Sequence, residues 1–326
     1  MASLAVPALA PRRALLFAAY AAVCLIWGST YYGIRLALDG FPPFMIGAAR
    51  FLGAGLTLLA VARARGEALP RPIEWGAAFV SGTLFFALGN GLVNLAEQSV
   101  SSGLASVLVA TMPLWMTVYG RAFGERVSAG EVLGVALGLA GVCILELGGE
   151  LRASPRGALL LLLAPMCWAL GSLASKRLPA ARATVTRTGA QMTAGGLVML
   201  LLSVGSGERI TATPSTGSIL AVAYLCVFGS LIGFTAFSYL LTHTRPAVAT
   251  SYAYVNPVIA VALGVFLGGE RFGVASAVGA LVILAAVGLV ARARTTLPRP
   301  AAAPGGSAVA VAAVVPPHAS THRTPV

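Results

Sequence analysis

The first candidate for chemistry is a charge inside an apolar run. Arg50 lies about seven residues into the run 43–62, which is long enough to form a helix that crosses a membrane. At 1.5 Å per residue, this places the guanidinium roughly 10 Å deep. Arginine at the centre of such a helix costs about 2.5–3.5 kcal/mol. Two roles would offset this cost: contact with a carboxylate or other acceptor on a substrate, or a fixed hydrogen bond to backbone carbonyls or a helix end.

A second polar feature follows the apolar run 74–95. Asn90, Asn94 and Glu97 are spaced by four and three residues, so they share one side of a helix. A polar side on a membrane helix must face protein or a wet cavity. Glu97 is expected to contact a substrate amine or carry a proton, or else to be a carboxylate at the outer end of the helix.

Aromatic and proline residues complete the candidate site. Aromatic rings within membrane helices either line a cavity or serve as packing and interface anchors. Pro113 and Pro257 each remove a backbone donor, so they are candidate hinges, with simple kinks as the alternative. Asn256 is expected to satisfy the carbonyl that Pro257 frees. The predicted cavity residues are Trp27, Tyr31, Arg50, Asn90, Asn94, Glu97, Trp115, Trp168, Gln191, Tyr252 and Asn256.

The composition indicates the class of protein that must position these residues. Of 326 residues, 58% are hydrophobic and 10% are charged, whereas a soluble domain is about a quarter charged. A polytopic all-α membrane protein is therefore expected. The net charge of +12 comes from short loops and not from a patch, which argues against nucleic-acid binding.

Motifs for cofactors and catalysis are missing from the sequence. The four cysteines lie in apolar runs without metal-ligand spacing, so no metal or cofactor is expected. The chain also has no HExxH, Walker A, GxSxG or aspartate-rich motif, so neither an enzyme nor an ATP-driven pump is expected.

Ten apolar windows are long enough to span a membrane. Their connections are short and carry turn-forming residues. Residues 1–13 are predicted to be a cytoplasmic N-terminus, and residues 295–326 a disordered cytoplasmic tail. The windows are 14–36, 43–62, 74–95, 102–120, 129–147, 157–175, 188–204, 217–241, 247–268 and 273–291. Of the 22 Lys and Arg residues, 16 fall on the side of the N-terminus, 5 on the opposite side, and Arg50 within the membrane, so both termini are predicted to be cytoplasmic.

The sequence also contains an internal repeat. Trp27 precedes Arg50 by 23 residues, and Trp168 precedes Gln191 by 23, so each tryptophan has a counterpart in the other half and the pair is expected to flank the cavity. The motif Gly-Glu-Arg closes the fourth window of each half, at 124–126 and 269–271, just before a helix start where a carboxylate is favoured. Five windows in each repeat, 14–147 and 157–291, make the second repeat enter the membrane inverted. Small residues at helical spacing, Gly134, Gly138 and Gly141, predict close helix packing.

The motifs of the chain resemble those of the EamA-type exporters of the drug/metabolite transporter superfamily. The resemblance is carried by "LIWGSTYYGIR", "FPPFMIGAARF", "GNGLVNLAEQSVSSGLASVLVATMPLW" and "GERVSAGEVLGVALGLAGV", and in the second half by "WALGSLASKRLP" and "YVNPVIAVALGVFLGGER". It covers roughly residues 14–291 and leaves the tail outside. It implies ten helices in two inverted five-helix repeats, a central cavity, and export of amino acids, metabolites or drugs across a bacterial inner membrane.

The expected function is secondary export of small molecules by alternating access. An uptake permease or a passive facilitator is the alternative within transport. An integral-membrane enzyme or a receptor is a distant alternative, because no catalytic cluster is present. A channel would need a continuous polar line, which the windows lack. The expected partners are a small-molecule substrate and the lipid bilayer, and a homodimer stays open.

Overall fold

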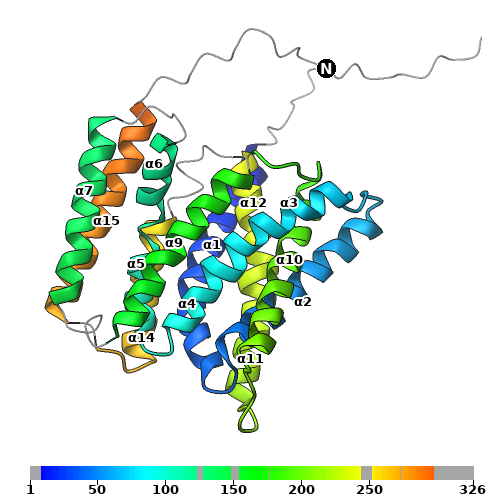
Figure 1. Cartoon of the computed structure of the whole chain (residues 1–326). Coiled ribbons are helices and arrows are strands. Elements are labelled where there is room, and N and C mark those ends of the chain that lie inside the picture. The colour runs from blue at the N-terminus through cyan, green and yellow to red at the C-terminus, as the bar shows by residue number, and fades with distance from the viewer. Residues whose placement is uncertain are drawn as a thin grey trace, which may run out of the picture. The chain divides into compact units, whose positions relative to one another are not determined.

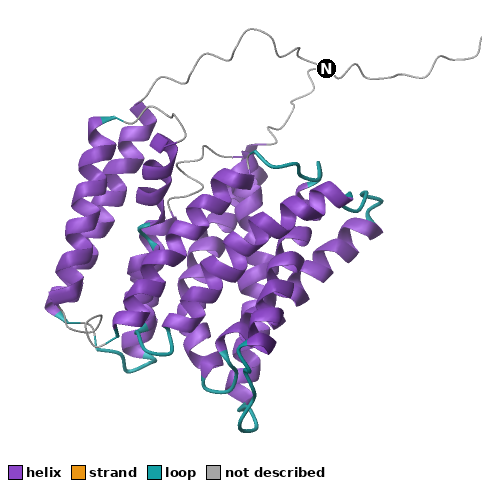
Figure 2. Cartoon of the chain, in the orientation of Figure 1, coloured by secondary structure: helices purple, strands orange, loops and turns teal. Residues whose placement is uncertain are grey.

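The computed structural model describes residues 9–122, 128–147, 154–175, 177–243, 252–271 and 273–296, and the regular structure within these ranges is helical (Figures 1 and 2). In chain order the helices are α1 (Leu9–Leu38), α2 (Pro43–Ala64), α3 (Pro72–Gly82), η1 (Thr83–Asn90), α4 (Gly91–Ala96), α5 (Ser102–Val109), α6 (Met112–Ala122), α7 (Ala129–Leu147), α9 (Pro155–Ser175), α10 (Thr184–Gly205), α11 (Thr216–Tyr224), η2 (Leu225–Ile232), α12 (Gly233–His243), α14 (Tyr252–Phe266) and α15 (Val274–Thr296).

Within the described ranges, seven helices or continuous helical runs are long and apolar enough to cross a membrane. They are Ala14–Leu38, Pro43–Ala64, Pro72–Ala96, Ser102–Ala122, Pro155–Ser175, Thr184–Gly205 and Thr216–Phe237. Shorter apolar helices, Ala129–Ile144, Val255–Phe266 and Ala277–Val290, lie within the other three predicted windows. The prediction of an all-helical membrane protein is confirmed for the described residues, while the count of ten spans stays a prediction.

The helix boundaries follow from residues that favour starts and stops. Prolines occupy the first position of α2, α3 and α9, where the missing N–H has no helical partner to lose. Ser101 and Ser215 cap α5 and α11, because each side-chain oxygen accepts a backbone N–H from the first turn.

Three of the helices whose ends the structure describes stop at a glycine with a left-handed backbone. α2, α10 and α14 are followed by Gly66 (φ 77°), Gly207 (φ 71°) and Gly269 (φ 65°). Side chains disfavour this conformation, so glycine stops the helix at low cost. The residue after each glycine is a glutamate whose N–H donates back to a carbonyl of the helix that has just ended: Glu67, Glu208 and Glu270.

The three glutamate carboxylates then bind neighbouring helices. Glu208 accepts the N–H groups of the second and third residues of α2, at 3.1 and 3.0 Å. Glu270 accepts the first two N–H groups of α5, at 2.9 and 3.1 Å. Glu67 accepts the hydroxyl of Thr186 in the first turn of α10, at 2.6 Å. Negative charge is stabilised at helix starts by the unpaired N–H groups and the dipole.

These contacts correct the interpretation of one Gly-Glu-Arg motif. Glu270 was predicted to favour the helix that follows it, but it caps α5, which lies much earlier in the chain. The reason is that the chain reverses at Gly269 and turns the carboxylate towards the neighbouring helix start. Glu125 of the first motif lies outside the described residues.

Helices α7 and α15 lie side by side, and small residues let them approach closely (Figure 1). A Cβ added to Gly134 would lie 3.0 Å from the Ala286 carbonyl oxygen, and one added to Gly141 would lie 3.1 Å from that of Gly279. Gly138 faces Leu114 of α6. The predicted role of these glycines in close packing is confirmed.

Candidate binding cavity

A cavity that is partly open to solvent lies among helices from both halves of the chain. Residues from α1, α2, η1, α4, α5, α6, α9, α12 and α14 line it. Among them are the predicted residues Trp27, Tyr31, Arg50, Asn90, Trp168, Tyr252 and Asn256. The predicted residues placed elsewhere are Asn94, Glu97, Trp115 and Gln191.

Two π-helical segments, η1 and η2, lie beside this cavity. They interrupt two long helices at positions 142 residues apart, and their wider turns alter the hydrogen bonding of the backbone. Polar side chains of the site bond to their carbonyls: Asn90 Nδ2 to Phe85 at 3.1 Å, Ser230 Oγ to Leu225 at 3.2 Å, and Trp27 Nε1 to Gly229 at 3.0 Å. Neither segment was predicted from the sequence, because apolar windows report the length of a helix but not its hydrogen-bond register.

Arg50 is nearly buried, with 3% of its surface exposed, and it lines the cavity. Its Nε donates to Ser230 Oγ at 2.8 Å, and its Cζ lies 4.7 Å from the centre of the Phe51 ring. The ion pair found in the described ranges joins Arg71 to Glu74 and does not involve Arg50. Arg50 therefore faces the cavity and also holds α2 against η2, so it has features of both predicted roles.

An aromatic wall forms one side of the cavity. The Trp27 ring lies 4.9 Å from Phe234 and 4.9 Å from Tyr252, centre to centre. Trp168 lies 6.4 Å from Phe234 and 5.4 Å from Phe85. Phe234 thus stands between the two tryptophans that were expected to flank the cavity. No sequence pattern distinguishes Phe234, because its window holds several aromatic residues of equal standing.

Two predicted residues have structural contacts away from the cavity. Asn94 is buried, and its Nδ2 donates to the Pro43 carbonyl at 3.0 Å, which ties α4 to the start of α2. Trp115 packs against Tyr119 in α6, with ring centres 6.4 Å apart. The polar side predicted for 90–97 therefore splits: Asn90 faces the cavity, and Asn94 faces protein.

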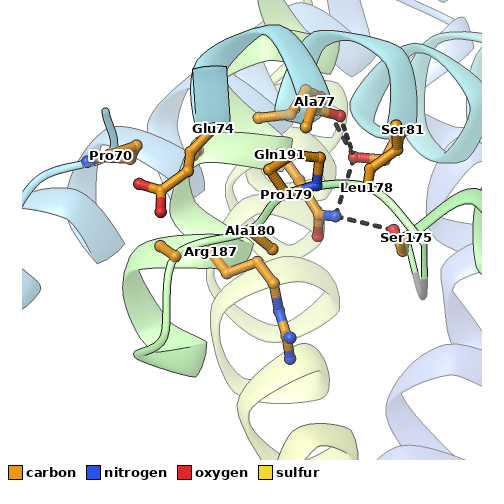
Figure 3. A pocket seen from close by; sticks show the side chains of 13 residues that line it. Pro70, Glu74, Ala77, Ser81, Ser175, Leu178, Pro179, Ala180, Arg187 and Gln191 are labelled. Carbon is orange, nitrogen blue, oxygen red and sulfur yellow. Dashed lines mark hydrogen bonds between the residues drawn. The ribbon is translucent and has the colours of Figure 1, made fainter. Parts of the chain in front are cut away.

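Gln191, the repeat counterpart of Arg50, lines a second and smaller pocket between α3, the end of α9 and α10 (Figure 3). Its Nε2 donates to Ser81 Oγ at 2.9 Å and to Ser175 Oγ at 3.0 Å. Ser81 in turn donates to the Ala77 carbonyl at 2.8 Å. The amide therefore belongs to a network of side chains in this pocket and lies outside the main cavity.

Pro113 does not kink a helix. It is the second residue of α6, where a missing N–H is tolerated. The interruption lies just before it, because α5 ends at Val109 and α6 begins at Met112. The role of Pro113 as a hinge stays a prediction.

Pro257 lies inside α14, one residue after Asn256. Oriented by its hydrogen-bond network, the Asn256 amide nitrogen donates to the carbonyls of Tyr252 at 3.2 Å and Cys24 at 3.3 Å. Proline frees the carbonyl four residues earlier, that of Ala253. The expectation that Asn256 satisfies this carbonyl is thus wrong, and the amide instead joins α14 to α1.

Glu97 lies beyond the cavity, as the first residue after the span Pro72–Ala96, and is fully buried. Neither carboxylate oxygen has a hydrogen-bond partner among the described atoms. Arg35 donates to the backbone carbonyl of Glu97, at 3.1 Å, and not to its carboxylate. Burial is the main cause that raises the pKa of Glu97 well above the ordinary glutamate value, and the nearby Glu270 carboxylate raises it further. Arg35 acts in the opposite direction and lowers this pKa.

The first prediction concerns this carboxyl group. A raised pKa in the folded state means that its contribution to stability is present at low pH and is lost as pH rises from about 4.3 through the raised value. Glu97→Gln cannot ionise, so its melting temperature relative to wild type should be higher at about pH 8 than at about pH 5. Thermal unfolding of purified protein measures this, with the exposed acid Asp39 (Asp39→Asn) as control. An equal difference at both pH values would show that Glu97 is ionised throughout.

Comparisons with known proteins place the chain in context. The EamA-like transporter family matches residues 12–147 and again residues 155–292. The "Uncharacterized inner membrane transporter YedA" of Escherichia coli strain K12 is 44% identical over 293 residues, which cover 89% of this chain and 95% of the relative.

More distant relatives and a solved structure also match. The "Probable terminal-alkyne amino-acid exporter" of Streptantibioticus cattleyicolor is 26% identical over 86% of this chain and 94% of its own length. A solved structure titled "Crystal structure of protein" is 20% identical, with a TM-score of 0.60, over 85% of this chain and 97% of that one. This last similarity concerns the fold alone.

Proposed function

Because this chain belongs to the EamA-like transporter family and is a multi-pass membrane transporter, we propose that it exports small organic molecules by alternating access through the cavity around Arg50. One observation carries the proposal. A nearly buried guanidinium faces a cavity that is lined by helices of both halves, and no carboxylate of the described residues pairs with it. Burying an unpaired cation is costly, and an acidic ligand would offset that cost.

The proposal includes ten spans in two inverted repeats, 14–147 and 157–291. Its supports are the two successive family matches, the π-helical segments 142 residues apart, and the glycine–glutamate ends of α2 and α10. Inverted repeats suit secondary transporters, whose sites form at the interface of the repeats near the middle of the bilayer.

The proposal also includes an orientation with both termini in the cytoplasm of a bacterium. Its support is the excess of Lys and Arg in the loops on the side of the N-terminus. The relative from Escherichia coli is named as an inner membrane transporter, which supports the same membrane for this chain. In this orientation Glu208 and Glu270 lie at the outer end of the bundle and Glu67 at the inner end.

The movement that alternates access would use the weak points of the helices. The interruption between Val109 and Met112 and the proline inside α14 both lie where the helical hydrogen-bond ladder is incomplete. α5 and α14 flank the cavity through Ser106 and Tyr252, so bending at these points would change access to it.

The second prediction tests the inverted repeats. Reporter fusions after Arg126 and after Arg271 should report opposite sides of the membrane, cytoplasmic for Arg126 and outer for Arg271. The reason is that five spans, an odd number, lie between these two corresponding loops. Alkaline phosphatase and green fluorescent protein fusions measure the two sides independently. Fusions on the same side would exclude five spans per repeat.

Transport itself is tested with labelled compounds in everted membrane vesicles, in which export appears as uptake. Amino acids, aromatic carboxylates and apolar amines should be compared in vesicles with and without the protein. Accumulation in everted vesicles supports export. Accumulation in right-side-out vesicles alone would make the protein an uptake permease, and equilibration without accumulation would make it a passive facilitator.

A further inference from the structure

The charge of the cavity is unbalanced. Arg50 is the ionised side chain in the described lining. Five of the acids that the structure describes are held by other partners: Glu67, Glu74, Glu131, Glu208 and Glu270. Asp39 is exposed, and Glu97 is buried beyond the cavity wall. The described part of the protein therefore offers no carboxylate to Arg50 and none to a ligand.

The guanidinium keeps donors for a ligand. A guanidinium has five N–H donors, and among the described residues the acceptor for Arg50 is Ser230, which takes only Nε. Gly229 makes room for the other end of the group, because a Cβ there would lie 3.2 Å from Nη2. A planar fork with free donors matches a carboxylate, which it can bind through two hydrogen bonds.

The aromatic part of the cavity lining suits a flat apolar body. Trp27, Trp168, Phe234 and Tyr252 all line the cavity, and their faces and edges pack well against another ring. Aromatic rings also attract cations, but an ammonium here would meet the charge of Arg50 at low dielectric without a carboxylate to bind.

From these observations, we infer that the substrate is a monoanionic carboxylate with a flat apolar body, recognised without an ammonium group. The inference rests on the proposed function, since it names the substrate class of the same cavity. We expect arylalkanoic acids to bind more tightly than their amides, their amines and the corresponding amino acids.

The third prediction tests this class by binding, which needs no transport. The probes share one ring and chain: 3-phenylpropionate, 3-phenylpropanamide, 3-phenylpropylamine and L-phenylalanine. Titration calorimetry on the full-length protein in lipid nanodiscs should give the acid an affinity at least about tenfold above the amide, because the amide loses the charge-assisted contacts. The amine should bind most weakly, and L-phenylalanine no more tightly than the acid.

The Arg50→Gln variant should bring the acid and the amide to similar affinities, whereas Arg63→Gln on the exposed side of the same helix should leave the ratio unchanged. The wild-type series decides the question even where a variant folds poorly. Equal binding of acid and amide by the wild type, or tenfold tighter binding of L-phenylalanine than of the acid, would overturn the inference. Binding as inferred without transport in vesicles would refute export and leave the ligand class standing.

Discussion

Replacing Arg50 with alanine should lower the transport rate by about 100-fold while the protein stays folded in the membrane. The loss follows from the removal of charge-assisted hydrogen bonds to the substrate, which are worth about 1.5–3 kcal/mol each. The fold should tolerate the change. Ser230, the partner of Arg50, still donates to the Leu225 carbonyl, and the variant removes a buried cation without leaving a buried anion unpaired.

Two control variants separate the charge from the shape of the side chain. Arg50→Lys keeps a positive charge but loses the planar fork, so its rate should fall between those of wild type and alanine. Arg63→Ala, at the exposed end of the same helix, should transport normally. Uptake into everted vesicles is measured per amount of protein, which immunoblotting and size-exclusion chromatography establish. Normal transport by Arg50→Ala would exclude the cavity as the route.

The largest effect on stability is expected at the contact between α3 and α10. A Cβ on Gly82 would overlap the Gln191 carbonyl oxygen and lie 3.0 Å from the Gly195 nitrogen. Both atoms belong to the backbone and cannot turn aside. Gly82→Val should therefore force the helices apart and lower the free energy of unfolding by about 3 kcal/mol.

A matched control lies in the same helix. Gly76 has no atom within 4 Å of an added Cβ, so Gly76→Val should change stability by only about 0.5 kcal/mol. Melting temperatures of both variants in detergent, with the yield of monodisperse protein, give the comparison. If the two variants have the same melting temperature, the backbones of α3 and α10 are not in contact at Gly82.

The architecture could be predicted from the sequence as far as it depends on apolar length. The runs around Trp27, Arg50 and Trp168 lie in spans of the structure, because the cost of unpaired backbone groups in lipid forces such runs into helices. The resemblance to EamA-type exporters is confirmed by the family match over both halves.

The contacts of individual side chains were harder to predict from the sequence. Asn94 was placed with Asn90 because four residues make one helical turn, but the structure gives Asn94 a backbone acceptor at Pro43. Gln191 was assigned by its equivalence to Arg50, yet equivalent positions in two diverged halves need not share surroundings, and its amide bonds two serines instead. The π-helical segments depend on hydrogen-bond register, which no pattern of apolar residues encodes.

The carboxylate caps of α2 and α10 have a mechanical consequence. Glu208 fastens the end of α10 to the start of α2, and Glu67 fastens the end of α2 to the first turn of α10. Because these hydrogen bonds join the antiparallel pair at both ends, the two helices cannot slide along each other without breaking the contacts at one end. In the proposed alternating-access cycle, these two helices would therefore move together as one rigid unit, and helices such as α1, α5 and α14, which also line the cavity, would move relative to them.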